Sequence, residues 1–350
     1  MNRKVFLTRL TKWEHWPSFM FYIPLIPFYL WNVIKVKNPI FFLAANPAIK
    51  YSGSGTESKY KTVLQIPYPY RPKTIFVAAN ENTAAVKNKI AESKINFPLI
   101  AKPDIGFRGL LVKKIDTLEI LENYIIKNNV DLIIQEFVAY ENECGIFYSR
   151  IPNQKKGKIT SITLKKFLTI TGDGSSTLSE LILKDERAYL YVDLLQNIHG
   201  ANMQTVLKNE EARILTVIGN HSKGTQFING NDLIDEELER FFDTLNNQIE
   251  GWFYGRLDIK YDTLEKLKQG ADFKILEING IIAEPTHIYD PTNASYFDAL
   301  KSLKNHWKIL AKIALINHHK FNVPYPKLGP YLKEIAWLRS YSKKLKRLNK

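Results

Sequence analysis

Two apolar segments, each carrying an acidic residue, constrain this chain more than any other feature. LDIKYD (257–262) and FKILEIN (273–279) have the composition of neighbouring buried strands. Glu277 is flanked by apolar residues on both sides, and an isolated buried carboxylate is costly unless it is paired or binds a metal. Glu277 and Asn279 are two residues apart and therefore point to the same face of their strand. If Asp258 faces them, three oxygen ligands of the kind that Mg²⁺ prefers converge.

A second segment, FPLIAKPDIGFRG (97–109), combines an expected strand with a glycine-bounded loop. Lys102 ends the strand, where its ammonium group can reach the phosphates of a nucleotide lying under the loop. Gly106 and Gly109 allow the backbone to approach a ligand closely. This segment predicts a phosphate-binding strand and loop.

The third segment, QEFVAYENECG (135–145), begins in an expected buried strand that stops at a hinge. The backbone groups exposed at such a hinge can hydrogen-bond an adenine edge. Glu143 follows, where its carboxylate can accept both ribose hydroxyls; alternatively, it is a surface acid. The loop SGSGTESK (52–59) lacks the spacing of a phosphate-binding P-loop, and it either holds an anion with its backbone amides or is a plain flexible loop.

The remaining pattern mixes strands and helices without a regular βαβ repeat, which predicts an α+β fold over a doubly wound sheet. We expect a short strand followed by a Gly/Ser-rich loop within 39–60, strands at about 74–78, 98–103, 109–115, 132–138, 145–152, 159–170, 257–262 and 273–279, and helices at 83–94, 116–128 and 295–317. The two strands at 145–152 and 159–170 alternate as antiparallel neighbours do.

Taken in order, these segments resemble the ATP-grasp superfamily, and within it the D-alanine–D-alanine-ligase-like and cyanophycin-synthetase-like enzymes. TITGDGSSTLSELI (169–182) is similar to the G-D-G-x-x-T-[IL]-x-E-L-I run of cyanophycin synthetases and ribosomal-protein glutamate ligases. The resemblance covers about residues 85–290. It implies two α+β lobes that grip ATP, with Mg²⁺ (one or two ions, or Mn²⁺) as the metal.

The resemblance also implies a role for each matching residue. Lys102 and Arg256 would act in catalysis, with Lys102 holding the ATP phosphates and Arg256 stabilising the transferring phosphoryl group. Asp258, Glu277 and Asn279 would hold the metal. The remaining ATP contacts would be Gly106 and Gly109 in a flexible lid, Glu136, Phe137 and Val138 at the adenine hinge, Glu143 at the ribose, and either Lys165 or Lys166.

Three departures from the family pattern concern the second substrate. Only about 45 residues separate the apolar N-terminal segment from Thr83, so the usual front lobe is reduced and a D-alanine substrate is disfavoured. AEPTHIYDP (283–291) replaces a glycine-containing ending, and we expect Glu284, Thr286 and His287 near the acceptor, although His287 is equally typical of a core histidine. HSKGT (221–225) is either a second substrate loop, with His221 and Lys223 facing an anion together with Arg213, or a solvated loop.

Charge is distributed unevenly along the chain. The net charge is +14, yet the first fifty residues carry seven Lys/Arg and one acid, and the last fifty carry thirteen Lys/Arg and one acid, so the middle is slightly acidic. A basic stripe across the folded body is therefore not expected, which excludes a nucleic-acid groove. Basic ends instead suit an anionic membrane surface; the alternative is a pair of solvated tails. Cys144 is the only cysteine, so no internal disulfide forms.

The stretch from Trp16 to Ile34 contains no charged residue. Its length nearly reaches the ~20 residues that span a bilayer, but Pro24 and Pro27 would each remove a helix hydrogen bond that lipid cannot replace. We expect it to dip into the membrane interface; spanning and packing on the body as a core helix are the alternatives. The tail YSKKLKRLNK (341–350) is expected to be disordered or adsorbed to the membrane, and the basic amphipathic helix at 295–317 to lie on the membrane or on its own domain.

The predicted organisation is thus a membrane-associating segment (1–38), a reduced N-terminal lobe (39–84), an ATP-grasp domain (85–294) and a basic C-terminal region (295–350). The predicted function is an ATP-dependent carboxylate–amine ligase, cytoplasmic and peripheral or monotopic at the inner membrane face, acting on small or lipid-linked acids and amines through an acyl phosphate. A kinase with the same fold and a non-catalytic, membrane-tethered nucleotide-binding module are the alternatives.

Overall fold

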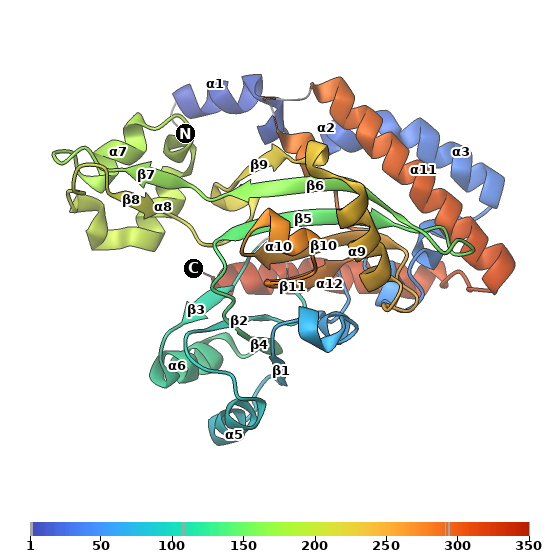
Figure 1. The fold of residues 1–350 in the computed structure, drawn as a ribbon, viewed down its shortest axis with the longest axis horizontal. Helices are drawn as coiled ribbons and strands as arrows, with labels where there is room; N and C mark the ends of the chain where they lie inside the picture. The colour runs from blue at the N-terminus through green and yellow to red at the C-terminus, as the bar shows by residue number, and fades with distance from the viewer. Residues whose placement is uncertain (1–2, 107–108, 291, 293–294, 350) are drawn as a thin grey trace.

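The strands form two antiparallel sheets and one short two-stranded ribbon, with helices around them (Figure 1). The computed structural model describes residues 3–106, 109–290, 292 and 295–349. The mixture of helices and strands confirms the predicted α+β class. The doubly wound part of the prediction is wrong: such a sheet is mostly parallel, whereas the strand pairs in the described residues are antiparallel.

The first sheet has four strands in the order β1-β4-β2-β3 and carries two helices on one face. Both helices begin at the residues that the sequence favours as caps: Asn82 accepts a hydrogen bond from the backbone of Ala84, and Thr117 accepts one from Ile120. Their apolar faces pack on the sheet in one core cluster. The elements are β1 (Thr74–Val77), α5 (Thr83–Ser93), β2 (Leu99–Pro103), β3 (Lys113–Ile115), α6 (Leu118–Asn128) and β4 (Leu132–Glu136).

The second sheet has five strands in the order β11-β10-β5-β6-β9, and its two faces differ in chemistry. One face packs on α9 and α10 around Trp252, Phe242 and Ile259. The other face carries the polar residues of the candidate site. The elements are β5 (Asn142–Ser149), β6 (Lys158–Lys166), β9 (Gln226–Asn229), α9 (Glu236–Asn246), β10 (Tyr254–Tyr261), α10 (Leu264–Lys268) and β11 (Phe273–Asn279).

A register shift between β10 and β11 explains how β11 contributes residues both to the core and to the cavity wall. Asp258 lies opposite Glu277, but Ile259 lies opposite Ile275, so Leu276 is an extra residue in β11. Ile275 and Ile278 therefore both join the core, while Glu277 lies in the wall of the cavity on the other face.

A small third unit, residues 167–225, projects to the left in Figure 1 and has its own apolar core. Its elements are β7 (Thr169–Thr171), α7 (Leu178–Lys184), α8 (Val192–His199) and β8 (Ala212–Ile214). The TITGDGSSTLSELI run forms the β7–α7 turn. Asp173 accepts hydrogen bonds from the backbone of Ser175 and Ser176, and Thr177 and Glu180 form a capping box at the start of α7.

The N-terminal segment is helical and broken at its prolines. It comprises α1 (Arg3–Thr11), the turn Trp13–His15, α2 (Phe19–Tyr22), the turn Ile23–Leu25 and α3 (Ile26–Val36). Pro24 and Pro27 each lie in the first turn of their helix, where a missing N–H costs little. Phe19–Val36 is long and apolar enough to cross a membrane, and 11% of that window is buried. The strand expected near residue 40 is wrong: Phe41–Ala44 is a 3-10 turn that packs under α11, and α4 (Lys59–Leu64) follows.

The C-terminal region forms two long helices, α11 (Tyr296–Phe321) and α12 (Leu328–Leu348). α11 confirms the predicted helix and packs Ala311 and Ala314 against Phe147 and Tyr254 of the second sheet. The prediction of a disordered tail is wrong for residues 341–348, because they belong to α12, which crosses the middle of the view in Figure 1 and places Leu345 in the core of the first sheet. The predicted domain boundaries stay predictions, although β1 shares a sheet with β2, β3 and β4 across residue 84.

Candidate functional site

A cavity of about 1510 Å³ is lined by the first sheet, the polar face of the second sheet, the third unit and the N-terminal segment. That volume exceeds the roughly 300–1,000 Å³ of a typical small-molecule site. The cavity therefore has room for more than one substrate. Most of the residues singled out in the sequence lie in its wall.

Asp258, Glu277 and Asn279 converge on one side of the cavity, as predicted from their spacing. Asp258 on β10 lies directly opposite Glu277 on β11, and Arg256 lies opposite Asn279. The Asn279 side chain donates a hydrogen bond to Asp258 Oδ2 over 2.8 Å. Arg256 grips both oxygens of Asp258, with Nε and Nη2 each at 3.1 Å.

The charges around these carboxylates keep them ionised. Burial would raise the pKa of Asp258, but Arg256 and Lys165 outweigh it and hold that pKa well below its usual range. Burial likewise opposes ionisation of Glu277, and the positive charges of Lys59 and Lys102 outweigh it, so its pKa is also lowered. The site thus presents two carboxylates and an amide oxygen among four positive groups.

Two lysines of the cavity wall, Lys102 and Lys165, have buried side chains. Lys102 donates to Gln135 Oε1 over 3.1 Å, and burial lowers its pKa. Lys165 Nζ lies 2.7 Å from Glu143 Oε1 and 3.1 Å from Asp258 Oδ1, and those two charges raise its pKa against the opposing effect of burial. Lys166 is exposed and does not line the cavity. Of the two lysines left open by the sequence, the structure brings Lys165 to the site.

The expected adenine and lid residues also line the cavity. Glu136 is the last residue of β4, Phe137 and Val138 follow it, and the Lys114 ammonium lies 5.0 Å from the centre of the Phe137 ring. The Glu136 N–H donates to the carbonyl of Lys73 over 2.9 Å. Glu143 is buried rather than a surface acid. Gly106 and Gly109 border the cavity, and the middle of the expected lid, 107–108, lies outside the described residues.

The residues expected near the acceptor separate into two groups. Glu284 lines the cavity, contacts the Tyr22 hydroxyl, and accepts from Tyr289 over 2.8 Å; its carbonyl accepts from Arg256 Nη1 over 3.1 Å. Thr286 also lines the cavity and pairs with Thr163 over 3.1 Å.

His287 is instead a core residue. It is 8% exposed, does not line the cavity, and lies 2.6 Å from Ser161 Oγ and 3.4 Å from Ser302 Oγ. Burial lowers its pKa to about 4.

Of the residues expected in a second substrate loop, Lys223 does not line the cavity, and Arg213 pairs with Glu211 over 3.3 Å on the surface of the third unit.

Several residues that line the cavity were missed by the sequence reasoning. Lys59 forms an ion pair with Glu277, and Gln135 holds Lys102. The SGSGTESK loop reaches the site because Gly53 packs on Gly280: a Cβ at Gly53 would lie 2.6 Å from the Gly280 Cα. The glycines of the loop were a visible signal of close approach, but nothing local linked Lys59 to a strand more than two hundred residues away.

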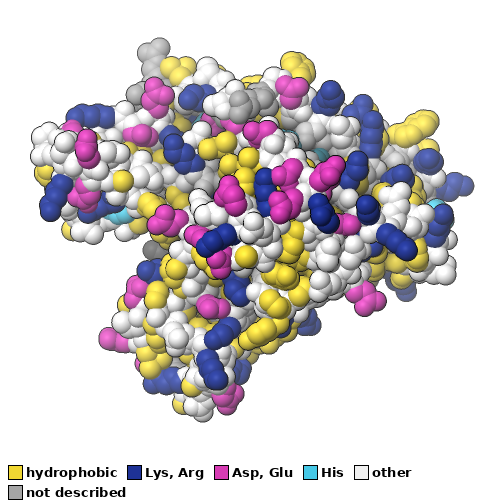
Figure 2. Space-filling view, viewed as in Figure 1, with side chains coloured by type: hydrophobic (Ala, Val, Ile, Leu, Met, Phe, Trp, Pro, Cys, Tyr) yellow, Lys and Arg dark blue, Asp and Glu magenta, His cyan; other side chains and the backbone are white. Residues whose placement is uncertain are grey.

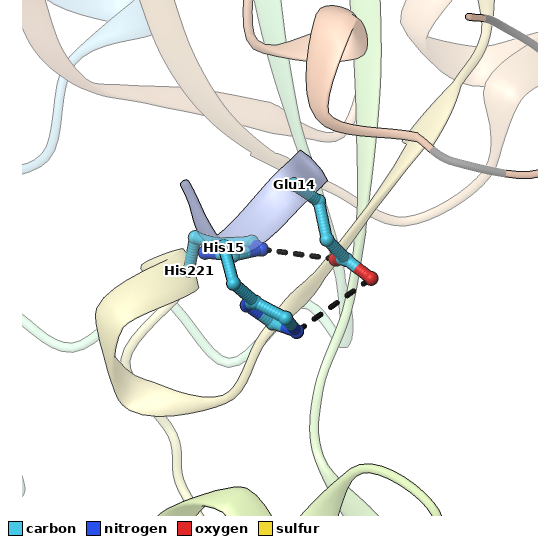
Figure 3. Close-up of side chains that lie close together, drawn as sticks. All are labelled: Glu14, His15 and His221. Atoms are coloured by element: carbon cyan, nitrogen blue, oxygen red, sulfur yellow. Dashed lines mark hydrogen bonds and ion pairs between the residues drawn. The ribbon is translucent and has the colours of Figure 1, made fainter. Parts of the chain in front are cut away.

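His221 lines the cavity within a cluster that includes Glu14 and His15 of the N-terminal segment (Figure 3). His221 Nε2 and Arg187 Nη1 each lie 3.1 Å from Glu14 Oε2. Burial opposes the charge on Glu14, but His221, Arg187 and His15 lower its pKa to about 2. The cluster joins the N-terminal segment to the third unit, and it had no counterpart in the sequence reasoning because its members are about 200 residues apart.

Comparison with protein-family models and with curated proteins finds no match. Among solved structures, the chain is similar to a bifunctional glutathione synthetase from Pasteurella multocida (12% identity, TM-score 0.41, covering 75% of this chain and 38% of that one). It is also similar to the VanG D-Ala:D-Ser ligase from Enterococcus faecalis (13%, 0.43, 76% and 64%) and to the ATP-grasp ligase PsnB complexed with a minimal precursor (12%, 0.38, 71% and 60%). The chain spans less than two thirds of each of these three proteins.

Proposed function

We propose that this protein is an ATP-dependent carboxylate–amine ligase that forms an amide bond through an acyl phosphate. The observation that supports this most is the convergence of Asp258, Glu277 and Asn279 with Arg256 and Lys165 on one wall of a large cavity. Phosphoryl transfer requires positioning and charge neutralisation more than covalent help. That wall supplies both.

The donor set fits Mg²⁺. Two ionised carboxylates and a carboxamide oxygen are hard ligands, and the cavity leaves room for phosphate oxygens to complete an octahedral shell. Asp258, Glu277 and Asn279 would hold the ion, which neutralises phosphate charge when bound. Lys59 and Arg256, which contact these carboxylates, would then turn toward phosphate oxygens.

The remaining residues of the wall take roles that follow from their positions. Lys102 and Lys165 bind phosphate oxygens, and Glu143 accepts hydrogen bonds from the ribose. Glu136, Phe137 and Val138 bind the adenine at the hinge. Arg256 stabilises the phosphoryl group as it passes to the acid substrate. Gly106 and Gly109 border the lid, which excludes the water that would otherwise hydrolyse the acyl phosphate.

The amine is proposed to enter beside Glu284. The backbone carbonyl of Glu284 accepts a hydrogen bond from Arg256. The Glu284 carboxylate contacts the hydroxyl groups of Tyr22 and Tyr289. Trp16, Leu303 and Trp307 line the same cavity, and Trp307 stacks on Tyr22 with ring centroids 6.0 Å apart. An apolar wall next to a carboxylate suits an amphiphilic amine. Tyr22 and Trp16 make the N-terminal segment part of this subsite.

The enzyme is also proposed to act at an anionic membrane surface. One face of the segment from α2 through the turn Ile23–Leu25 to α3 is apolar and exposed, with Phe19, Ile23, Ile26, Leu30 and Ile34 between 44% and 72% exposed. Neighbouring α11 presents exposed lysines at positions 301, 304, 308 and 312, and Figure 2 shows basic side chains gathered over the end where these helices lie. Each lysine held near anionic lipid is worth about 1 kcal/mol.

Liposome flotation tests the membrane proposal. We expect the full chain to float with anionic vesicles, and the variant Ile23→Ser/Leu30→Ser/Ile34→Ser to stay in solution. The matched control is Ile126→Ser, which removes an equally exposed apolar side chain from α6. Equal flotation of the triple variant and the wild type would reject the membrane face.

Turnover with hydroxylamine tests the ligase itself. Hydroxylamine traps an acyl phosphate as a hydroxamate, which mass spectrometry detects, so candidate acids can be screened before the amine is known. We expect Mg²⁺-dependent release of ADP and phosphate with formation of a hydroxamate, and loss of both in Glu277→Gln. Glu265→Gln, an exposed acid on α10, is the matched control. A phosphorylated product that accumulates without any hydroxamate would favour the kinase instead.

A further inference from the structure

The cluster of Glu14, His15 and His221 has the composition of a metal site outside the Asp258 wall. Glu14 and His15 come from the turn Trp13–His15, and His221 comes from the turn His221–Lys223 of the third unit. Figure 3 shows both imidazole rings beside the Glu14 carboxylate. Two histidines and one carboxylate that leave a position open are a known zinc ligand set.

The spacing of the ligand atoms is close to what a tetrahedral ion requires. Bonds of about 2.1 Å place the ligands of a tetrahedral ion about 3.4 Å from one another. His15 Nε2 lies 3.7 Å from Glu14 Oε1, and His221 Nε2 lies 3.1 Å from Glu14 Oε2. One ligand atom from each of the three residues lies within 4.8 Å of the others. The two distances end on different carboxylate oxygens, so His221, which contacts Oε2, must turn its ring toward Oε1 for all three residues to bind one ion there.

His15 provides the second, independent observation. Its side chain is 7% exposed, and its Nε2 is buried without a hydrogen-bond partner among the described residues. A buried nitrogen that lacks a partner is costly. It lies beside Glu14 Oε1, the carboxylate oxygen that no described residue hydrogen-bonds. In the tautomer that carries its proton on Nδ1, His15 presents the Nε2 lone pair to the same ion as Glu14 Oε1.

Arg187 organises the cluster without blocking it. Its guanidinium contacts Glu14 Oε2, and two backbone carbonyls, of Gly224 and Thr225, hold it in place at 2.9 and 3.1 Å. An ion on Oε1 leaves the contact of Arg187 with Oε2 intact. Ligating carboxylates are commonly hydrogen-bonded in this way by a neighbouring residue.

We propose that Glu14, His15 and His221 bind a borderline divalent cation of the zinc type, with a fourth position open to the cavity. All three residues line the cavity, so that position can take water or an anionic group of a bound substrate. The ion adds to the contacts that already join the N-terminal segment to the third unit, which are the Glu14–Arg187 ion pair, Thr8 with Tyr189, and Arg9 with the carbonyl of Leu190. This site does not depend on the proposed ligase activity.

Zinc and cobalt binding to the full chain tests the site. After chelator treatment and dialysis, we expect one equivalent of Zn²⁺ to bind by calorimetry in excess Mg²⁺, and Co²⁺ to give the intense visible absorption of a tetrahedral ion. Loss of a ligand in His15→Ala or His221→Gln should weaken binding by at least about tenfold. His319→Ala, an exposed histidine on α11, should leave binding unchanged.

A double variant in the Asp258 wall tests whether metal binding at this cluster is independent of that wall. The Asp258→Asn/Glu277→Gln double variant should keep the Zn²⁺ stoichiometry and the Co²⁺ spectrum, whatever it does to turnover. Circular dichroism establishes that each histidine variant is folded. If only one of the two variants folds, its loss of binding is enough to test the site. Binding that survives in both histidine variants, or that disappears in the Asp258→Asn/Glu277→Gln background, would overturn the proposal, as would the absence of binding in the wild type.

Discussion

Replacing Lys165 by Met should destabilise the protein strongly, because this lysine neutralises two buried carboxylates at once. Its side chain is 5% exposed, and its ammonium group lies 2.7 Å from Glu143 and 3.1 Å from Asp258. Arg256 still covers Asp258 after the change, but Glu143 loses its ion-pair partner. Removing one partner of a buried ion pair costs about 3–5 kcal/mol, and we expect Lys165→Met to lower the free energy of unfolding by that amount.

Lys166→Met is the matched control, since the neighbouring lysine is exposed on the same strand and outside the cavity. Its effect should stay within about 0.5 kcal/mol. Urea denaturation near neutral pH, followed by circular dichroism without nucleotide, measures both variants. Equal unfolding free energies for the two variants would refute the assignment of Lys165 to a buried charge network.

The difference between Lys165→Met and the wild type should shrink in acid. Asp258 has a usual pKa of 3.8, which the fold lowers. A lowered carboxyl pKa adds stability above the unfolded value, and that stability is lost as pH falls through the folded value. Below about pH 4, the wild type therefore loses the part of its unfolding free energy that comes from the lowered Asp258 pKa. Lys165→Met lacks one of the two charges that lower this pKa, so it has less of this free energy to lose. A deficit that stays constant down to pH 3 would contradict this reasoning.

Three further changes test other parts of the structure. In Gly145→Ala, the new Cβ would lie 2.9 Å from Arg256 Cδ, and we expect a fall in kcat of about tenfold to a hundredfold with nucleotide binding retained; Gly329→Ala, which meets nothing within 4 Å, should be silent in the same kinetic assay. Leu345→Ala should cost about 2–5 kcal/mol in urea denaturation because Leu345 is buried under the first sheet, whereas Leu332→Ala, exposed on the same helix, should cost little; similar losses would contradict the docking of α12. His287 has a pKa of about 4 in the folded protein against a usual 6.5, so the unfolded chain binds this proton more readily. The unfolding free energy of the wild type should therefore fall by about 3 kcal/mol as pH falls from 6.5 to 4. His287→Asn should flatten this dependence of unfolding free energy on pH, and an unchanged dependence would place the titration elsewhere.

The local part of the site was predictable because strand periodicity fixes it. Glu277 and Asn279 share a face by alternation, and Asp258 meets them because the two strands pair across a short connection. The positions of Lys102 near the end of β2 and of Phe137 just after β4 were predictable from where the apolar runs stop. The bulge at Leu276 was not predictable, since no residue there signals an extra position.

The site contacts that could not be predicted from the sequence join segments that are far apart in the chain. Lys59 meets Glu277, Tyr22 meets Glu284, and Glu14 meets His221 across more than 200 residues in each case. No periodicity specifies such a pair. The C-terminal helix was missed for a different reason: α12 has only a sparse apolar stripe, in which Leu338 and Leu345 are buried, and the lysines of YSKKLKRLNK mask its end.

The most direct test of the central claim is to label the oxygens of an acid substrate with ¹⁸O and to follow the label into the released phosphate. The substrate is an acid that forms a hydroxamate in the trapping assay. Transfer of one carboxylate oxygen to phosphate requires an acyl phosphate, so we predict ¹⁸O-labelled phosphate in the wild type and in Glu265→Gln, and none in Glu277→Gln. Amide or hydroxamate formation with unlabelled phosphate, or label transfer that persists in Glu277→Gln, would contradict an acyl-phosphate ligase built on the Asp258–Glu277–Asn279 wall.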